Sequence, residues 1–254
     1  MKKWFRNIRK NITIVLAGGV LMMMIGFSNV ENENNVCGEI VVNLHNTTEN
    51  HFLDENDVIG IITEHGMKEI RGLTMEEISL KEIEKRLYTE RYIERAEIYK
   101  DLRGNILVDA ELRRPIARII RRSTQDAYLT EDGMIVPVSE KFTSRTIIIS
   151  GNYTEKITSP SMDKMELDNL ISMISFIRAN PFWNAQIAQM DINRRGEITM
   201  YTQVSKQLIE FGKVEDYEDK FLKLKVFYEK ILPSKGWNTY ERVNVKFKDQ
   251  IIAE

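Results

Sequence analysis

The chain has 254 residues, of which 36 are lysine or arginine and 38 are aspartate or glutamate, so the formal net charge is −2. A nucleic-acid-binding surface requires a basic excess, and this balance therefore argues against a nucleic-acid partner. The single cysteine, Cys37, cannot form a disulfide within its own chain, which excludes a disulfide-stapled fold. The length suffices for one large domain or two small ones.

An uncharged stretch, residues 11–30, lies near the start of the chain. A helix of about 20 mostly apolar residues spans the hydrocarbon core of a bilayer, so we expect a transmembrane anchor over residues 12–30. Basic residues precede the stretch and acidic residues follow it, which places residues 1–11 in the cytoplasm and the rest of the chain outside it. Four apolar side chains are taken as the anchor positions: Ile12, Leu16, Leu21 and Phe27.

A cleaved signal peptide is the alternative interpretation, because a basic start and a short apolar region describe both. Gly26 and Ser28 are small enough to precede a cleavage site, but no Ala-x-Ala pattern occurs. The uncleaved anchor is therefore favoured. The polar residues 31–38 then form a spacer between the anchor and the first folded module.

Residues 39–114 have the pattern of a small α+β module. A β-branched run at residues 40–44 predicts the first strand. Asp54 and the Ser79–Glu82 capping box each open a helix. Two further strands flank a turn at residues 101–104. The order strand, helix, helix, strand, strand predicts a small sheet with both helices on one face.

Residues 115–254 form a larger region in which strands dominate, and we expect a β-rich domain with two flanking helices. The predicted elements are, in chain order, a hairpin turn at residues 131–133, a strand at 146–149, a helix opened by Asp163 and ended by Asn180 and Pro181, strands at 188–192 and 198–202, a helix at 214–232 stopped by Pro233, and a strand at 243–251.

No catalytic or metal-binding constellation is visible in the sequence. The three histidines, His45, His51 and His65, lack the cysteines or spaced carboxylates that a zinc site requires. Neither a nucleophile elbow nor a phosphate-binding glycine loop occurs. We therefore expect no enzyme activity, no cofactor, no metal and no small-molecule ligand.

The last predicted strand, residues 243–251, ends so close to the C-terminus that no later strand is available to pair with it. At the edge of a sheet its free backbone groups would permit β-augmentation by a partner strand. The alternative is a plain edge that Lys246 and Lys248 protect against unwanted pairing. The sequence leaves both interpretations open.

Several short stretches, in their order along the chain, together carry a family resemblance. The most telling is ELRRPIARI at residues 111–119, and the others are Phe52-Leu53 with Asp57-Val58, and residues 76–87, 92–99, 128–137, 211–212, 220–228 and 236–240. Together they resemble the FtsQ/DivIB family of bacterial cell-division proteins in its short, compact form. This family joins its two domains with a segment ending in Pro-x-Ala-Arg, so Arg114, Pro115 and Arg118 would mark the domain junction.

The resemblance implies a POTRA domain at residues 39–114, implicated in recruitment by upstream division proteins, and a β domain at residues 115–254 whose last strands bind the FtsB/FtsL pair. The protein would be a non-enzymatic, bitopic scaffold of the inner membrane at the division septum, linked to septal peptidoglycan synthesis. An FtsB-like strand added at the C-terminal strand would contact Tyr240, Arg242, Val243, Val245, Lys246, Phe247, Gln250 and Ile251.

Three alternatives stay open. The first is a POTRA-containing periplasmic assembly or binding protein released by signal-peptide cleavage. The second is an outer-membrane assembly or secretion factor, which would call for several such modules or a membrane barrel, and neither is visible. The third is an exported hydrolase whose site is not apparent from the sequence.

Overall fold

The computed structural model describes residues 16–23, 36–47, 50–203 and 207–254. Residues 16–23 are helical, and the anchor positions Leu16 and Leu21 lie in this helix. The other two anchor positions, Ile12 and Phe27, lie outside the described residues. Among the residues that are described, we find no helix both long and apolar enough to cross a membrane.

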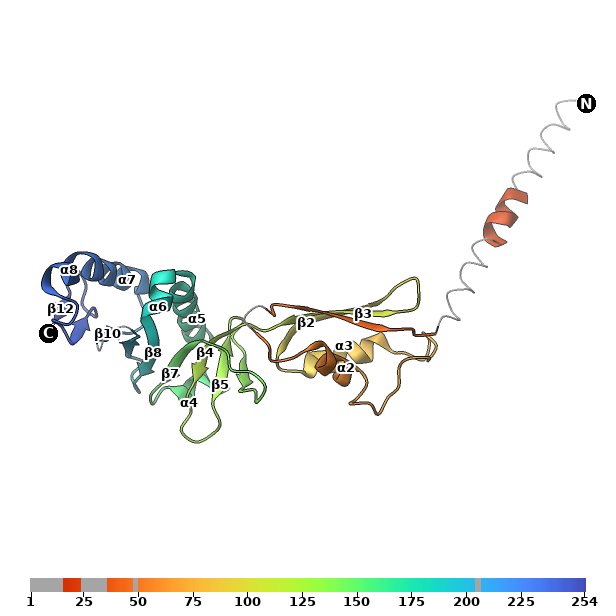
Figure 1. The fold of residues 1–254 in the computed structure, drawn as a ribbon, viewed down its shortest axis with the longest axis horizontal. Coiled ribbons are helices and arrows are strands. Elements are labelled where there is room, and N and C mark those ends of the chain that lie inside the picture. The colour runs from red at the N-terminus through yellow and green to blue at the C-terminus, as the bar shows by residue number, and fades with distance from the viewer. Residues whose placement is uncertain (1–15, 24–35, 48–49, 204–206) are drawn as a thin grey trace, which may run out of the picture. The chain divides into compact units, whose positions relative to one another are not determined.

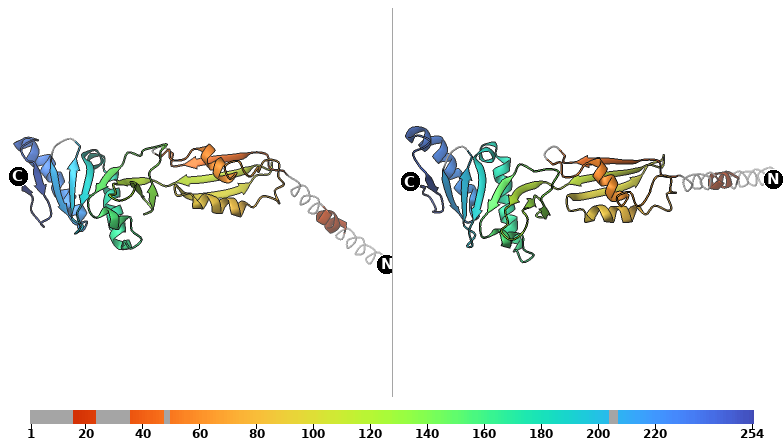
Figure 2. Two further views of the ribbon diagram at one scale, coloured as in Figure 1. Left: turned by 90° about the horizontal axis from the view of Figure 1, so that it is seen from below. Right: turned by 60° about the horizontal axis from the view of Figure 1, so that its bottom comes forward.

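The chain divides into two compact units, one made of residues 1–45 and 53–112 and the other of residues 46–52 and 113–254. The first unit contains a three-stranded sheet with the order β1-β3-β2, in which β3 pairs parallel with β1 and antiparallel with β2. The strands run side by side in Figure 2, and the two helices cover one face of the sheet (Figure 1). The elements are β1 (Ile40–His45), α2 (Glu55–Ile62), α3 (Leu80–Thr89), β2 (Ile93–Lys100) and β3 (Ile106–Leu112). The α+β module with the predicted element order is confirmed.

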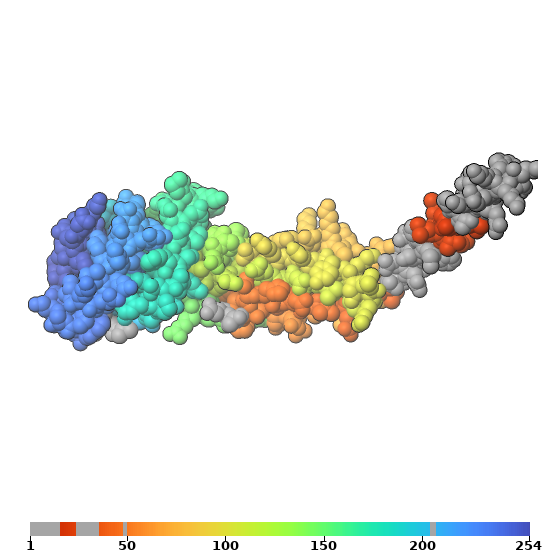
Figure 3. Space-filling model, turned by 90° about the horizontal axis from the view of Figure 1, so that it is seen from above, coloured from red at the N-terminus to blue at the C-terminus, as the bar shows by residue number. Residues whose placement is uncertain are grey.

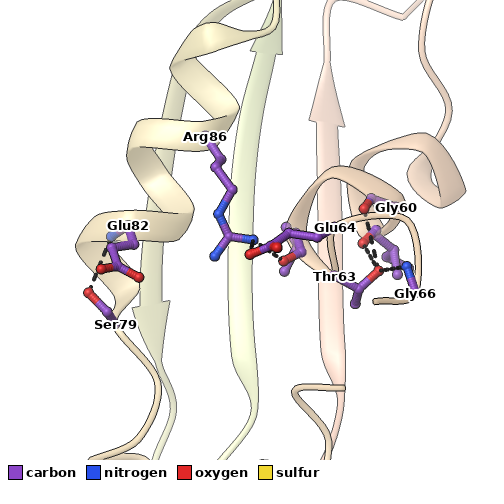
Figure 4. Close-up of polar contacts among 9 residues, drawn as sticks. Gly60, Thr63, Glu64, Gly66, Ser79, Glu82 and Arg86 are labelled. Carbon is purple, nitrogen blue, oxygen red and sulfur yellow. Dashed lines mark hydrogen bonds and ion pairs between the residues drawn. The ribbon is translucent and has the colours of Figure 1, made fainter. Parts of the chain in front are cut away.

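Polar side chains fix the helix ends of the first unit (Figure 4). The Ser79 hydroxyl caps α3 by accepting the Glu82 N–H at 3.4 Å. Asp54 caps α2 in the same manner, within a reciprocal capping box. Arg86 of α3 donates to the Ile62 carbonyl at 2.7 Å, which satisfies a backbone acceptor at the end of α2. These local contacts explain why the two helices begin where the sequence predicts.

The second unit is built on a nine-stranded sheet with the order β12-β11-β10-β9-β8-β7-β4-β5-β6. Its pairs are antiparallel except β4–β7, β7–β8 and β10–β11. The strands are β4 (Pro115–Ile119), β5 (Ala127–Thr130), β6 (Ile135–Pro137), β7 (Ile147–Ser150), β8 (Ile187–Ile192), β9 (Ile198–Thr202), β10 (Leu208–Gly212), β11 (Arg242–Asn244) and β12 (Ile252–Ala253).

The longer helices of the second unit, α5 and α7, pack with α6 on one side of this sheet (Figure 1). Buried residues of α5 and α7, such as Ile174 and Phe221, share one core cluster with the strand residues Ile149, Met190 and Phe211. The helical segments are α4 (Thr154–Ile157), α5 (Lys164–Ala179), α6 (Pro181–Gln186), α7 (Tyr217–Val226), the π-helix η1 (Phe227–Ile231) and α8 (Leu232–Lys235).

The expected end of the last helix at Pro233 is wrong. The helix widens into the π-turn η1, where the Leu232 N–H bonds to the Phe227 carbonyl, and it then continues through Pro233 as α8. Proline lacks the N–H of a regular α-helical bond, and its ring clashes with the preceding turn. The π-turn accommodates both defects, and the helix ends instead at Gly236, whose φ of 102° only glycine adopts without strain.

The single strand expected at residues 243–251 is also wrong. The chain leaves β11 after Asn244, turns, and returns as the short strand β12, which pairs antiparallel with β11. The Asn244 side chain accepts the Lys246 N–H at 3.0 Å, a local bond that competes with continued pairing. Asp249 then adopts a left-handed φ of 60°. The apolar alternation therefore extends through a turn rather than along one strand.

The segment Asn46–Phe52 belongs to the second unit, although its position in the sequence predicts that it is part of the first module. The Asn50 amide donates to the Arg113 carbonyl at 2.5 Å. The Phe52 ring is 2% exposed and lies 5.3 Å from the ring of Tyr128, measured between centroids. The segment between β1 and α2 therefore packs with the second unit, whereas the residues on both sides of it belong to the first.

Candidate functional site at the C-terminal sheet edge

The last residues of the chain, dark blue in Figure 3, lie at the surface of the second unit and end in the edge strand β12. Glu254 exchanges both backbone hydrogen bonds with Arg242, its N–H donating to the Arg242 carbonyl at 3.0 Å and its carbonyl accepting the Arg242 N–H at 3.0 Å. Bonded and non-bonded pairs alternate in antiparallel strands, so the neighbouring residue Ala253 points its N–H and C=O away from β11. Within the described part of the chain, no strand pairs with that outer side of β12.

Glu210 of β10 ties this edge to the sheet. Its carboxylate accepts from Arg242 at 2.5 Å and from the Asn244 amide at 2.9 Å, and it lies 3.2 Å from the Lys246 ammonium. The hydrogen bond from Arg242 is the largest cause that holds the pKa of the Glu210 carboxyl below its ordinary value. One acidic side chain therefore joins β10, β11 and the turn that follows β11.

Lys223 of α7 fixes the same turn from the helix side. Its ammonium donates to the Val245 carbonyl at 3.0 Å and to the Phe247 carbonyl at 2.6 Å. Charged donors make stronger hydrogen bonds than neutral ones. The turn between β11 and β12 is thus held by the Lys223 ammonium on one side and by the Glu210 carboxylate on the other.

The expected partner-binding residues divide into three groups in the structure. Val243 and Val245 are fully buried, and the Val245 N–H donates to the Glu210 carbonyl, so these two are core residues rather than contact residues. Tyr240 and Ile251 are half-buried against the same core. The exposed members are Arg242, Lys246, Phe247 and Gln250.

Sequence reasoning missed four residues of the site: Glu210, Lys223, Ile252 and Ala253. Two large apolar side chains are exposed here: Ile252 in the edge strand is 41% exposed, and Phe247 in the turn before it is 48% exposed. The only sequence signal for β12 is the adjacent Ile251-Ile252 pair. Nothing in the sequence pairs Glu210 with Arg242, because that contact spans two strands brought together by folding.

The predicted junction residues, Arg114, Pro115 and Arg118, all lie in the second unit. Pro115 opens β4, where a missing N–H is tolerated. Arg118 forms an ion pair with Asp126 at 2.7 Å, and the Arg114 guanidinium donates to the Asn46 side chain. These arginines thus stabilise the start of the second unit.

The histidines occupy separate environments. His45 lies 3.8 Å from Asp109, and the His51 ring packs edge-on against Phe142 at 5.3 Å between centroids. Across the described ranges, no three His, Cys, Asp or Glu side chains are grouped so that they could hold a metal ion.

Protonation of the Glu210 carboxylate at acid pH is expected to lower the stability of the second unit at this edge. A carboxyl whose pKa is lowered on folding stabilises the protein above its ordinary pKa, and that contribution is lost as the pH falls through the folded value. We expect a Glu210→Gln variant to be about 1 kcal/mol less stable than wild type at neutral pH. In denaturant titrations between pH 7 and 3, the two proteins should converge at the acid end. A constant difference at every pH would contradict this role.

Replacing Lys223 by methionine should loosen the turn at residues 246–250, because two carbonyls lose a charged donor while the aliphatic stem is kept. We expect a loss of about 1–2 kcal/mol and faster amide exchange in this turn. Lys225→Met is the matched control, since the exposed Lys225 forms just one ion pair with a described residue, to Glu229 at 3.8 Å. Equal effects of the two substitutions would argue against the proposed anchoring.

Comparison with known families adds to this geometry. A family model described as "FtsQ/DivIB, C-terminal related" matches residues 114–254, which is more than half of the chain. A second model, described as a POTRA-like domain, matches residues 35–111. No curated protein matches the chain.

Proposed function

Because this chain belongs to the FtsQ/DivIB family, we propose that it is a non-enzymatic scaffold of bacterial cell division that binds a partner strand along β12. In this proposal the partners are FtsB-like and FtsL-like proteins, and the POTRA-like first unit receives upstream division proteins. The scaffold links both to septal peptidoglycan synthesis.

One observation carries the binding mode: the outer side of β12 presents the unpaired N–H and C=O of Ala253 at the end of a nine-stranded sheet, with no strand of the described chain beside it. An added strand would gain main-chain hydrogen bonds from this edge, while side-chain pockets would give specificity. Phe247 and Ile252 are the exposed apolar contacts nearest in sequence to the edge. Arg242 is already bound to Glu210, so it contributes to the rigidity of the edge.

We further propose that the uncharged stretch at residues 12–30 anchors the protein in the inner membrane, with its N-terminus in the cytoplasm and its folded units outside. The charge asymmetry of the flanking residues supports this orientation. N-terminal sequencing of the mature protein checks the proposal. Retention of the N-terminal stretch is expected, whereas a mature N-terminus at Asn29 would indicate the released periplasmic form instead.

Ala253→Pro tests the binding mode, because it removes the outward N–H of β12 while leaving the Arg242–Glu254 bonds to β11 in place. Full-length wild type and variant, purified in detergent, are used to capture the FtsB-like and FtsL-like proteins of the same organism. We expect the variant to lose at least about tenfold in affinity, because the partner strand loses a donor and meets the proline ring.

Ala253→Ser is the matched control, since it keeps the backbone N–H at the same position. It should capture the partners as wild type does. Unchanged capture by Ala253→Pro would overturn strand addition at β12. Val245→Pro is unsuitable for this purpose, because Val245 is buried and its N–H bonds to the Glu210 carbonyl, so proline would disturb folding itself.

A further inference from the structure

A groove opens in the second unit where the neighbouring parallel strands β7 and β8 begin. The two strands pair from Ile148 and Gln189 onward. Before this point β8 is preceded directly by helix α6, whereas β7 is preceded by residues 142–146, which have no regular secondary structure. The two chain segments therefore diverge, and a hollow of about 830 Å³ lies between them.

The charged side chains that line this groove are both arginines, Arg145 and Arg178, and its described lining contains no aspartate or glutamate. Arg145 is exposed and forms no ion pair with any described residue. Arg178 and Ser144 also line a second hollow of about 490 Å³, which adds Arg114 and a single carboxylate, Glu131. The groove is thus a basic surface within a chain whose net charge is −2.

Uncharged groups complete the walls of the groove. Small or apolar residues line the side formed by α6 and β8: Pro181, Ala185, Ile187 and Ala188. The opposite wall is formed by residues 142–146, which belong to no strand. Within this wall the Ser144 N–H donates to the Tyr128 hydroxyl at 3.1 Å. The same wall includes Thr146, whose buried hydroxyl oxygen has no hydrogen-bond partner in the described structure. A buried polar group without a partner costs stability, and a ligand that reached it would remove that cost.

We propose that this groove binds an extended, acidic peptide segment of a partner protein, with carboxylate side chains directed at Arg145 and small apolar side chains directed at Ala185 and Ala188. Arginine favours carboxylates because its planar fork can donate two parallel hydrogen bonds. The main chain at residues 142–146 belongs to no strand, so a bound peptide, unlike another polyanion, can form strand-like hydrogen bonds beside it.

This site is distinct from the C-terminal edge. Strands β9, β10 and β11 separate β8 from β12 in the sheet. The two sites can therefore be occupied by different segments, and a substitution at one leaves the other intact. Peptide binding at this groove is thus independent of strand addition at β12.

The test is fluorescence anisotropy with a labelled synthetic peptide of alternating glutamate and alanine, added to the full-length protein in detergent. The peptide of alternating glutamine and alanine serves as the neutral probe, and inorganic polyphosphate serves as the non-peptide anion. We expect the acidic peptide to bind wild type, and Arg145→Glu to weaken that binding by about tenfold or more because like charges then face each other.

Arg122→Glu is the matched control. It makes the same charge change at an exposed arginine just beyond the C-terminal end of β4, whereas the groove lies at the N-terminal end of the parallel strand β7. Amides at residues 142–146 should exchange more slowly in the presence of the acidic peptide. The proposal would be overturned if Arg145→Glu and Arg122→Glu weakened binding of the acidic peptide equally, or if the neutral peptide bound as well as the acidic one. It would also be overturned if polyphosphate bound in an Arg145-dependent manner while the acidic peptide did not bind.

Discussion

Replacing Gly151 by alanine is expected to destabilise the second unit by about 4 kcal/mol or more, a large effect for one methyl group. Gly151 follows β7 with a φ of 102°, a backbone conformation that side chains with a Cβ rarely adopt. A Cβ at this position would lie 2.3 Å from the carbonyl oxygen of Ile192 and 2.8 Å from its backbone nitrogen. Both atoms belong to the end of β8, so the clash cannot be relieved by a side-chain rotation.

Thermal or denaturant unfolding of Gly151→Ala beside Gly196→Ala checks this expectation. Gly196 also has a positive φ, of 77°, but its Cβ would meet only the ring of Tyr153 at 3.8 Å, which is an ordinary contact. The control should therefore lose only about 1 kcal/mol. Comparable losses in the two variants would show that the close approach of β7 and β8 is not what requires glycine at position 151.

Replacing Phe52 by alanine should cost about 3–4 kcal/mol, and the loss should fall on the second unit although Phe52 lies between β1 and α2 of the first. The ring is 2% exposed and packs against Tyr128 and Phe142, with centroid distances of 5.3 and 5.4 Å. Truncation leaves a cavity that the sheet cannot close completely. Hydrogen exchange resolved by residue distinguishes the units.

In that experiment the amides of β5 should lose protection, while those of β3 in the first unit keep theirs. His51→Ala is the matched control, because His51 is exposed and contacts only the edge of Phe142 in the described structure. It should change stability by less than about 1 kcal/mol. Loss of protection confined to β3 would contradict the assignment of residues 46–52 to the second unit.

The first module was predictable because its signals are local. Asp54 and Ser79 cap helices through side-chain bonds to residues three positions later, so both partners of each bond are close together in the sequence. The turn at residues 101–104 joins strands that are adjacent in sequence. Apolar periodicity then determines which faces are buried.

The second unit was harder to predict because its decisive contacts are distant in sequence. Apolar alternation at residues 243–251 resembles one strand, but the Asn244 side chain and the left-handed Asp249 turn the chain back on itself. The Glu210–Arg242 pair depends on the parallel pairing of β10 and β11. No local sequence pattern predicts that these two strands pair. The same limit applies to Phe52, whose tertiary partners lie about eighty residues away in sequence.

Amide hydrogen exchange at Ala253 is the most direct test of strand addition at β12. The full-length protein is measured alone and with its FtsB-like partner. Because the Ala253 N–H points away from β11 and meets no described residue, we expect it to exchange rapidly in the free protein and to slow markedly in the complex. Rapid exchange at Ala253 in a complex that has formed would show that the partner binds elsewhere and would contradict the account.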